Sequence, residues 1–371
     1  MRSQGVAQLG STRARRWAVV AAVTAAVALI PGAIRLVPAS EAAVSAPGLL
    51  GRVLASAGVS YSGLAESSAG LSLPDVEGAG RLAAMFGEHT RMRVWYEDPT
   101  HWRVDELTPI GERDLYRDPY GTWYWDSGRR HATRTEGEGT VRFARPADLL
   151  PPELGRRLAA PASPAELSLV PTERIAGIDA AGLRITPDDG GTTLDHADLW
   201  VDPASGLVVR AAITARGMKD PIISTSFLDL EQRKPASRIT RFELPEDAGA
   251  HFSEAPDFAR AVDRYSPYVL PETIAGATKR AGAGATGTYG RHFSLIAVLV
   301  LPDRFFPEDR LSALPEVAGP WDSARVAASP LLNALTIVDD GTAYVLGGTV
   351  TTDRLVAVAS TLLVQGVEVR P

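Results

Sequence analysis

The sequence of 371 residues contains no cysteine. Disulfide bonds, thiol nucleophiles, thiolate metal sites and a lipidated cysteine are therefore excluded. The six histidines lie far apart, and no two of them have the spacing of metal ligands. The acidic pairs at 188–189 and 339–340 fall in turns. Glu136, Glu138 and Asp148 lack the spacing of a calcium loop, so we expect no metal site.

An excess of positive charge is also missing. The chain has 38 Lys and Arg against 44 Asp and Glu, which gives a formal net charge of -6. A weakly acidic chain lacks the broad basic field that nucleic-acid binding requires, so we expect no nucleic-acid partner. With 45% hydrophobic and 22% charged residues, the chain fits neither wholesale disorder nor a polytopic membrane protein. Its length suggests two domains.

Motifs for catalysis or cofactor binding are scarce. No G-x-S-x-G elbow occurs, so a Ser-His-Asp triad would have to be dispersed along the chain. Residues 282–287 read G-A-G-A-T-G, which matches G-x-G-x-x-G. A dinucleotide site needs a strand before this motif and a helix after it, whereas we expect a helix over 271–279 and a strand over 293–301. We therefore interpret 282–287 as a loop, and we expect no cofactor, no catalytic residue and no enzyme activity.

The N-terminus carries an export signal. Three arginines at 13, 15 and 16 precede the uncharged run from Trp17 through Ile30 to Ile34. This pattern indicates either a cleaved signal peptide or a retained membrane anchor, which we place at 1–46. A buried helix of a cytoplasmic protein is the remaining interpretation. Both leading interpretations send the rest of the chain across the membrane, so we expect a cell-envelope protein.

The exported part has the pattern of antiparallel strands. Met92, Val94 and Tyr96 alternate with polar residues, and Trp102 and Val104 share a face after the turn at 97–100, which predicts a hairpin. Further strands are expected over 122–126, 173–178, 182–187, 197–201, 207–214, 222–230 and 239–244, and short helices over 47–57, 80–89 and 153–159.

Together these elements predict an α+β protein with two domains. The larger domain, 47–248, is a long antiparallel meander that must bury one face. A polar, irregular stretch at 249–267 is interpreted as a linker. The smaller α+β domain, 268–371, is expected to contain strands over 293–301, 335–338 and 342–346 and a closing helix over 351–363.

The most unusual feature is a concentration of aromatic residues. The first interpretation is that they form a core and a cross-strand ladder, since aromatic side chains pair well on sheets. The second is that some of them line a cavity for an apolar ligand inside a curved sheet. The eight residues are Trp95, Tyr96, Trp102, Tyr116, Tyr120, Trp123, Tyr124 and Trp125.

Three segments resemble a known family. They are Y-S-G at 61–63, V-W-Y-E-D-P-T-H-W-R at 94–103 and L-W-V-D-P-A-S-G-L-V-V-R at 199–210. The sequence resembles the N-terminal domain of the sigma-E regulatory proteins RseB and MucB, relatives of the lipoprotein carriers LolA and LolB. The strand-turn-strand-helix layout at 335–363 is similar to the C-terminal domain of RseB, so the resemblance covers about 48–365. It implies a strongly curved, half-barrel antiparallel sheet that cradles helices around a hollow for acyl chains.

The resemblance also implies a function. In RseB-like proteins the exported regulator binds the extracytoplasmic part of an anti-sigma factor and protects that factor from proteolysis. Lipid binding relieves the protection. We therefore expect a membrane-associated regulator with an apolar, lipid-like ligand and an anti-sigma factor or another membrane protein as partner. The alternatives are a carrier of lipid or lipoprotein, which a retained anchor disfavours, and an exported hydrolase. The residues expected to line the hollow are Tyr61, Met92, Val94, Tyr96, Trp102 and Val104.

Overall fold

The computed structural model describes residues 44–70, 89–108, 111–137, 145–254, 258–306 and 311–370. These belong to one compact unit, 42–371. The segment marked by Trp17, Ile30 and Ile34 and most of the helix expected over 80–89 lie outside the described residues. Among the described helices, none combines the length and hydropathy needed to cross a bilayer.

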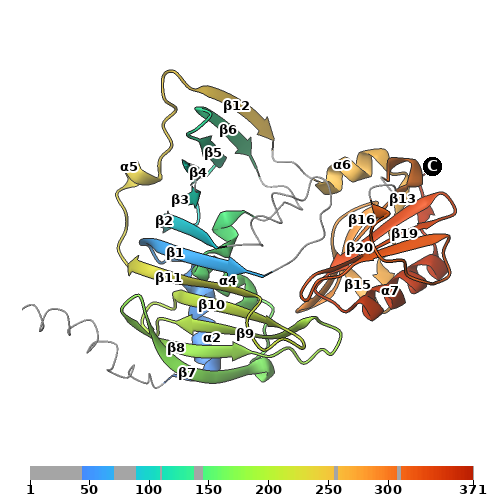
Figure 1. Ribbon diagram of the computed structural model, residues 1–371, viewed down its shortest axis with the longest axis horizontal. Helices are drawn as coiled ribbons and strands as arrows, with labels where there is room; N and C mark the ends of the chain where they lie inside the picture. Colours follow the sequence, from blue (N-terminus) through green and yellow to red (C-terminus); the bar gives the residue numbers. More distant parts are fainter. Residues whose placement is uncertain are drawn as a thin grey trace, which may run out of the picture. The chain divides into compact units, whose positions relative to one another are not determined.

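Twelve strands of the described chain form one large sheet, in the order β12-β6-β5-β4-β3-β2-β1-β11-β10-β9-β8-β7 (Figure 1). Neighbours pair antiparallel, except that β12 runs parallel to β6. The edge strands β12 and β7 do not pair with each other, so the sheet is open. The strands are β1 (Tyr61–Ala69), β2 (Thr90–Asp98), β3 (His101–Thr108), β4 (Gly111–Asp118), β5 (Gly121–Asp126), β6 (His131–Glu136), β7 (Leu167–Ile175), β8 (Ile178–Ile185), β9 (Leu194–Val201), β10 (Val208–Ala215), β11 (Ile223–Glu231) and β12 (Gly249–Glu254).

The predicted hairpin is confirmed as β2 and β3. Met92, Val94 and Tyr96 are buried on one face, while Arg91 and Arg93 are exposed on the other, as the alternation requires. The turn between the strands is held by Asp98, whose carboxylate accepts hydrogen bonds from the backbone N–H and hydroxyl of Thr100 at 2.7 and 2.6 Å. Local sequence pattern and turn chemistry therefore fix the register of this hairpin.

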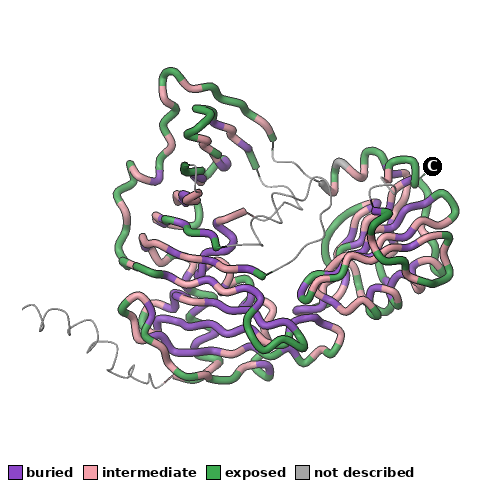
Figure 2. Tube along the Cα trace, in the orientation of Figure 1, coloured by how far each residue is buried: buried purple, intermediate pink, exposed green. Residues whose placement is uncertain are grey.

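Two helices pack against one face of the large sheet, which we call the inner face (Figure 1). Helix α2 (Ala46–Ala55) begins at Ser45, whose hydroxyl accepts a bond from the N–H of Gly48, and helix α4 (Pro151–Ala159) follows the 3-10 turn η2 (Pro146–Leu149). Their apolar side chains join those of β8, β9 and β10 in a single core. Figure 2 shows this concentration of buried residues along the sheet strands. Apolar burial on this scale is the main stabilising contribution to the domain.

The turn after β9 requires glycine. Gly206 has a φ of 76°, a conformation that residues with a Cβ rarely adopt. A Cβ there would also collide with the backbone of Arg52 in α2. Asp202 stabilises the same turn by accepting bonds from the N–H of Ala204 at 3.0 Å and the hydroxyl of Ser205 at 2.7 Å. The D-P-A-S-G segment thus joins the hairpin to the helix beneath it.

The C-terminal region has its own core. In the described chain a second sheet has the order β14-β15-β16-β17-β20-β19-β18, and β13 pairs with β21. Helix α7 (Thr352–Gln365) begins at Thr351 and buries Leu355, Val358 and Leu362 against the sheet. The strands are β13 (Tyr268–Val269), β14 (Thr273–Ile274), β15 (Ala277–Ala281), β16 (Thr286–Arg291), β17 (Ser294–Pro302), β18 (Ser323–Ala327), β19 (Asn333–Asp339), β20 (Thr342–Gly348) and β21 (Glu368–Val369).

Three predicted elements are wrong. The strand expected over 173–178 crosses the turn between β7 and β8, because Ala176 and Gly177 both have positive φ. The helix expected over 271–279 is instead the hairpin of β14 and β15, because Ala275 and Gly276 both have positive φ and form a tight turn. The strand expected over 239–244 is instead the short helix α5 (Ser237–Thr240) followed by an extended segment. Residues 282–285 form the loop between β15 and β16, and Thr286 and Gly287 already belong to β16, so a strand rather than a helix follows the loop. The stretch 249–267 contains β12 and helix α6 (Phe258–Tyr265).

Candidate ligand-binding site

A pocket of about 350 Å³ lies on the inner face, between β1–β4 and the segment that contains η2 and α4. This volume is at the lower end of the range for small-molecule sites, so it accommodates one slender ligand. The wall formed by the sheet is aromatic and aliphatic, and the wall formed by the helical segment is largely charged. The lining residues are Ala57, Tyr61, Val94, Tyr96, Pro99, Trp102, Val104, Arg117, Arg145, Ala147, Asp148, Leu150, Glu153 and Arg156.

Two stacked tyrosines form the floor of the pocket. The rings of Tyr61 and Tyr96 lie 5.0 Å apart and nearly parallel, and Phe227 meets Tyr61 edge-on at 5.7 Å. The hydroxyl of Tyr96 donates to the carbonyl of Ala57 at 2.7 Å, which ties the floor to the end of α2. Burial raises the pKa of Tyr96 to about 12 and raises the pKa of Tyr61 further. Both phenols therefore remain neutral at physiological pH and serve as apolar, rigid surface.

Five of the six residues expected to line a hollow lie on the wall of this pocket: Tyr61, Val94, Tyr96, Trp102 and Val104. Met92 does not. It is fully buried in the core next to the pocket, where it packs with its neighbours on β1 and β2. The cross-strand pairs Tyr61–Tyr96, Val94–Val104 and Tyr96–Trp102 bring these side chains together. Their role as ligand contacts stays a prediction.

The charged residues of the pocket could not be predicted from local sequence patterns. Arg117 comes from β4, Arg145 precedes η2, and Arg156 lies in α4, so only the fold brings the three guanidinium groups to one pocket. Arg156 donates to Glu153 at 2.8 Å, yet its buried Nη1 has no hydrogen-bond partner within the described chain. Leaving a buried donor of a charged group unsatisfied is costly. Arg156, on the wall that also carries Arg145, Asp148 and Glu153, keeps one N–H group of its guanidinium without a partner among the described residues.

The other half of the aromatic concentration lies on the opposite face of the same strands, which we call the outer face. Tyr116, Trp123 and Trp125 contact Phe242, with ring centroids 5.2, 4.8 and 6.0 Å away. The guanidinium of Arg103 lies 5.0 Å from the ring of Trp95 and 4.9 Å from that of Tyr116. The contacts on the outer face agree with the first interpretation, a cross-strand aromatic core, whereas a ligand-binding role of the inner-face residues stays a prediction.

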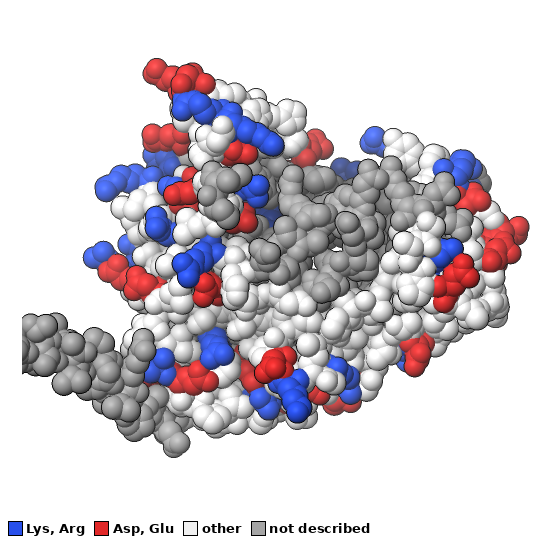
Figure 3. All heavy atoms as spheres, viewed as in Figure 1, with Lys and Arg blue, Asp and Glu red and all other residues white. Residues whose placement is uncertain are grey.

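Surface charge is mixed. On the face drawn in Figure 3, acidic and basic side chains of the described residues are interspersed. Many are paired across strands, as in the bidentate pair of Arg184 with Asp198 at 2.7 Å. This distribution agrees with the slightly negative net charge of -6 and differs from the continuous basic stripe typical of nucleic-acid-binding proteins.

No family model and no curated protein matches the chain. Solved structures do resemble it. The chain is 16% identical to MucB in a crystal structure with MucA(peri), with a TM-score of 0.48 over 88% of this chain and 100% of that chain. A complex of Pseudomonas aeruginosa MucA/MucB gives the same values. A LolA superfamily protein from Nitrosomonas europaea is 12% identical, with a TM-score of 0.25 over 54% of this chain and 99% of that chain.

Proposed function

We propose that the chain is an exported, membrane-associated regulatory protein that binds one amphiphilic, lipid-like ligand in the inner pocket. The observation that carries this proposal is the two-sided lining: an aromatic floor of Tyr61 and Tyr96 faces a wall that contains Arg145 and Arg156. An apolar chain would lie on the floor, where its burial is favourable by about 25 cal/mol per Å². An anionic end would accept from the unused Nη1 of Arg156.

The partner we propose is the extracytoplasmic part of a membrane protein such as an anti-sigma factor. The support for this partner is the resemblance of the sequence at 61–63, 94–103 and 199–210. The regulatory mechanism is linkage: a ligand preferred by one conformation changes the affinity for the partner by its own difference in binding free energy. A carrier without a regulatory partner is the alternative, and it differs by passing its ligand to acceptor membranes.

The proposal is tested by native mass spectrometry of the protein purified from a membrane-containing host, followed by organic extraction. We expect one co-purifying lipid per chain. Ala147 lines the pocket and is buried, so Ala147→Trp should fill the pocket and abolish the bound lipid. Ala160 is exposed just after α4, so Ala160→Trp is the matched control and should keep the lipid. An empty wild-type protein that also ignores added lipids contradicts the proposal.

The charged wall has a separate test. Arg156→Gln removes a charge-assisted hydrogen bond worth about 1.5–3 kcal/mol, so it should weaken the binding of an anionic amphiphile about 10- to 100-fold. Arg174→Gln, which breaks the exposed pair with Asp179 on β7 and β8, is the control and should bind normally. Equal affinity of wild type and Arg156→Gln, with the pocket-filling variant still empty, would contradict the role of Arg156 in binding the anionic group.

A further inference from the structure

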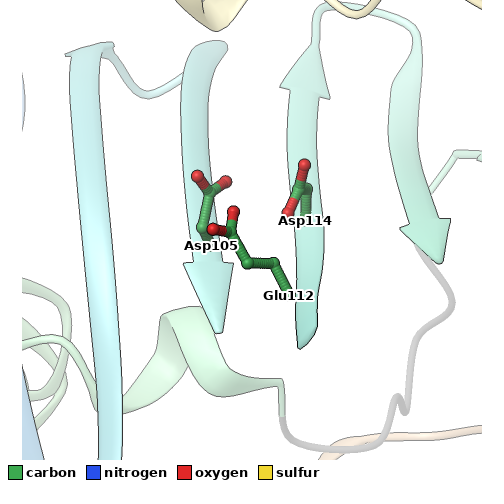
Figure 4. A group of neighbouring side chains, drawn as sticks. All are labelled: Asp105, Glu112 and Asp114. Atoms are coloured by element: carbon green, nitrogen blue, oxygen red, sulfur yellow. The ribbon is translucent and has the colours of Figure 1, made fainter. Parts of the chain in front are cut away.

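Three carboxylates converge on the outer face, away from the pocket. Asp105 on β3 lies directly opposite Asp114 on β4, and Glu112 joins them from the same strand as Asp114 (Figure 4). One oxygen of each residue lies within 4.8 Å of one oxygen of each other residue. Two oxygens bound to one Ca²⁺ at about 2.3–2.6 Å lie at most about 5 Å apart. The three side chains can therefore reach one shared ion as they stand.

The cluster contains an unsatisfied acceptor. The side chain of Asp114 is more than nine-tenths buried, with 8% exposed, and its Oδ1 has no hydrogen-bond partner among the described residues. Its Oδ2 accepts from Arg103 at 3.1 Å, and the same guanidinium donates to Asp105 at 2.6 Å. Arg103 precedes Asp105 on β3 and so approaches the pair from the side opposite Glu112. Burying a carboxylate oxygen without a donor or a cation costs free energy, so a ligand that binds Oδ1 would lower the free energy of the folded protein.

Charge and ligand type identify that ligand. Three carboxylates, the guanidinium of Arg103 and the exposed guanidinium of Arg93, the cross-strand neighbour of Asp105, leave a formal charge of -1, which favours binding of a cation. The three ligands are all hard oxygens, which disfavours zinc, and exposed Glu112 leaves the site open to water. Ca²⁺ tolerates such an irregular set completed by water better than Mg²⁺ does.

We propose that Asp105, Glu112 and Asp114 form a Ca²⁺ site that joins β3 to β4 on the outer face. The ion would cross-link two strands of the wall whose inner side carries Val104 and Arg117 of the pocket. Sequence reasoning missed the site because its ligands do not lie in a single loop. Residues 105 and 114 meet only through the register of two strands.

The test is titration of the full-length protein at neutral pH with Ca²⁺ by calorimetry and with Tb³⁺ by luminescence excited through tryptophan. Trp125 is the cross-strand neighbour of Asp114, so Tb³⁺ bound at the site should be sensitised. We expect one ion per chain, with a Kd of about 10⁻⁴–10⁻³ M, the range of extracellular sites. Glu112→Gln, on an exposed side chain, should weaken binding at least tenfold, and Asp114→Asn should remove the sensitised emission.

Glu106→Gln is the matched control, because Glu106 follows Asp105 on β3 but lies on the inner face, where it pairs with Arg113. It should bind Ca²⁺ and Tb³⁺ like the wild type. Asp114→Asn keeps the shape of the side chain, and circular dichroism in EDTA verifies that this variant is folded. Failure of the wild type to bind either ion at millimolar concentration overturns the proposal, as do unchanged affinities of Glu112→Gln and Asp114→Asn. Tighter binding of Mg²⁺ or Zn²⁺ than of Ca²⁺ overturns the choice of ion.

Discussion

The two faces of strands β2–β5 are built from the same aromatic-rich segment and have different properties. On the inner face, Tyr96 and Trp102 border a pocket, because the segment of η2 and α4 approaches the sheet with charged side chains rather than filling it. On the outer face, Phe242 lies over Trp123 and its aromatic neighbours. Alternation along a strand assigns each side chain to a face, and the covering segment decides whether that face is core or site.

The comparison also separates two uses of arginine. Arg103 on the outer face has both aromatic rings and carboxylates around it, so its donors are engaged. Arg156 on the inner face keeps a buried donor without a partner. An engaged guanidinium contributes to structure, whereas an unused one is available for a ligand. The following substitutions test the comparison of the two faces, from the largest expected effect to the smallest.

Tyr61→Ala should have the largest effect. Tyr61 is 1% exposed and contacts both Tyr96 and Phe227, so its removal should lower the free energy of unfolding by about 3–5 kcal/mol. Urea denaturation followed by circular dichroism measures this change. Tyr120→Ala, at a side chain that is 75% exposed, is the control and should change stability by less than about 0.5 kcal/mol. Similar losses for both variants would show that the inner floor is not a packed core.

Trp102→Ala should separate binding from stability. Trp102 lies half-buried at the pocket, so its loss should cost only about 1–3 kcal/mol of stability. It should nevertheless reduce lipid affinity at least tenfold, since a large apolar contact surface is lost. Equilibrium binding of a fluorescent fatty acid and urea denaturation measure the two quantities. A stability loss as large as that of Tyr61→Ala, with unchanged affinity, would assign Trp102 to the core alone.

Phe242→Ala should show the reverse pattern. Phe242 is half-buried over three aromatic rings of the outer face, so its removal should cost about 1–2 kcal/mol and increase the exposure of tryptophan to acrylamide quenching. Lipid affinity should stay at the wild-type value, because the pocket lies on the other face. Weaker lipid binding in this variant would mean that the two faces are coupled.

The smallest effect is expected at the ion pair between Glu97 on β2 and Lys234, which follows β11. The hydrogen bond from Lys234, at 2.7 Å, holds the pKa of Glu97 below its usual value. Folding therefore favours the ionised carboxylate, and its contribution is complete above the unfolded-state pKa and is lost as pH falls through the lowered value. Glu97→Gln should therefore lower the thermal midpoint slightly above about pH 5 and hardly at all near pH 3, which flattens the dependence of the midpoint on pH between about 5 and 3. A larger effect at pH 3 than at pH 8 would contradict this sign.

Elements whose determining residues lie close together in the sequence could be predicted, whereas features that depend on distant residues could not. The hairpin of β2 and β3, helix α2 and helix α7 follow from nearby periodicity and capping residues, and all three are confirmed. The segment 271–279 was misjudged because its alanines suit a helix, whereas Ala275 and Gly276 adopt a turn that only the folded sheet selects. The charged wall and the three-carboxylate cluster depend on how separate elements pack and pair, which the spacing of these residues along the chain does not show.

The most direct test of the inner pocket as the ligand site is photo-crosslinking with a diazirine-bearing fatty acid, read by peptide mass spectrometry. The account predicts labels on the peptides of β2, β3 and α4 that contain Tyr96, Trp102 and Arg156. Competition by unlabelled fatty acid and the pocket-filling variant Ala147→Trp should both remove these labels. Specific labelling of the outer face around Trp123 and Phe242, or no competable label at all, would contradict the account.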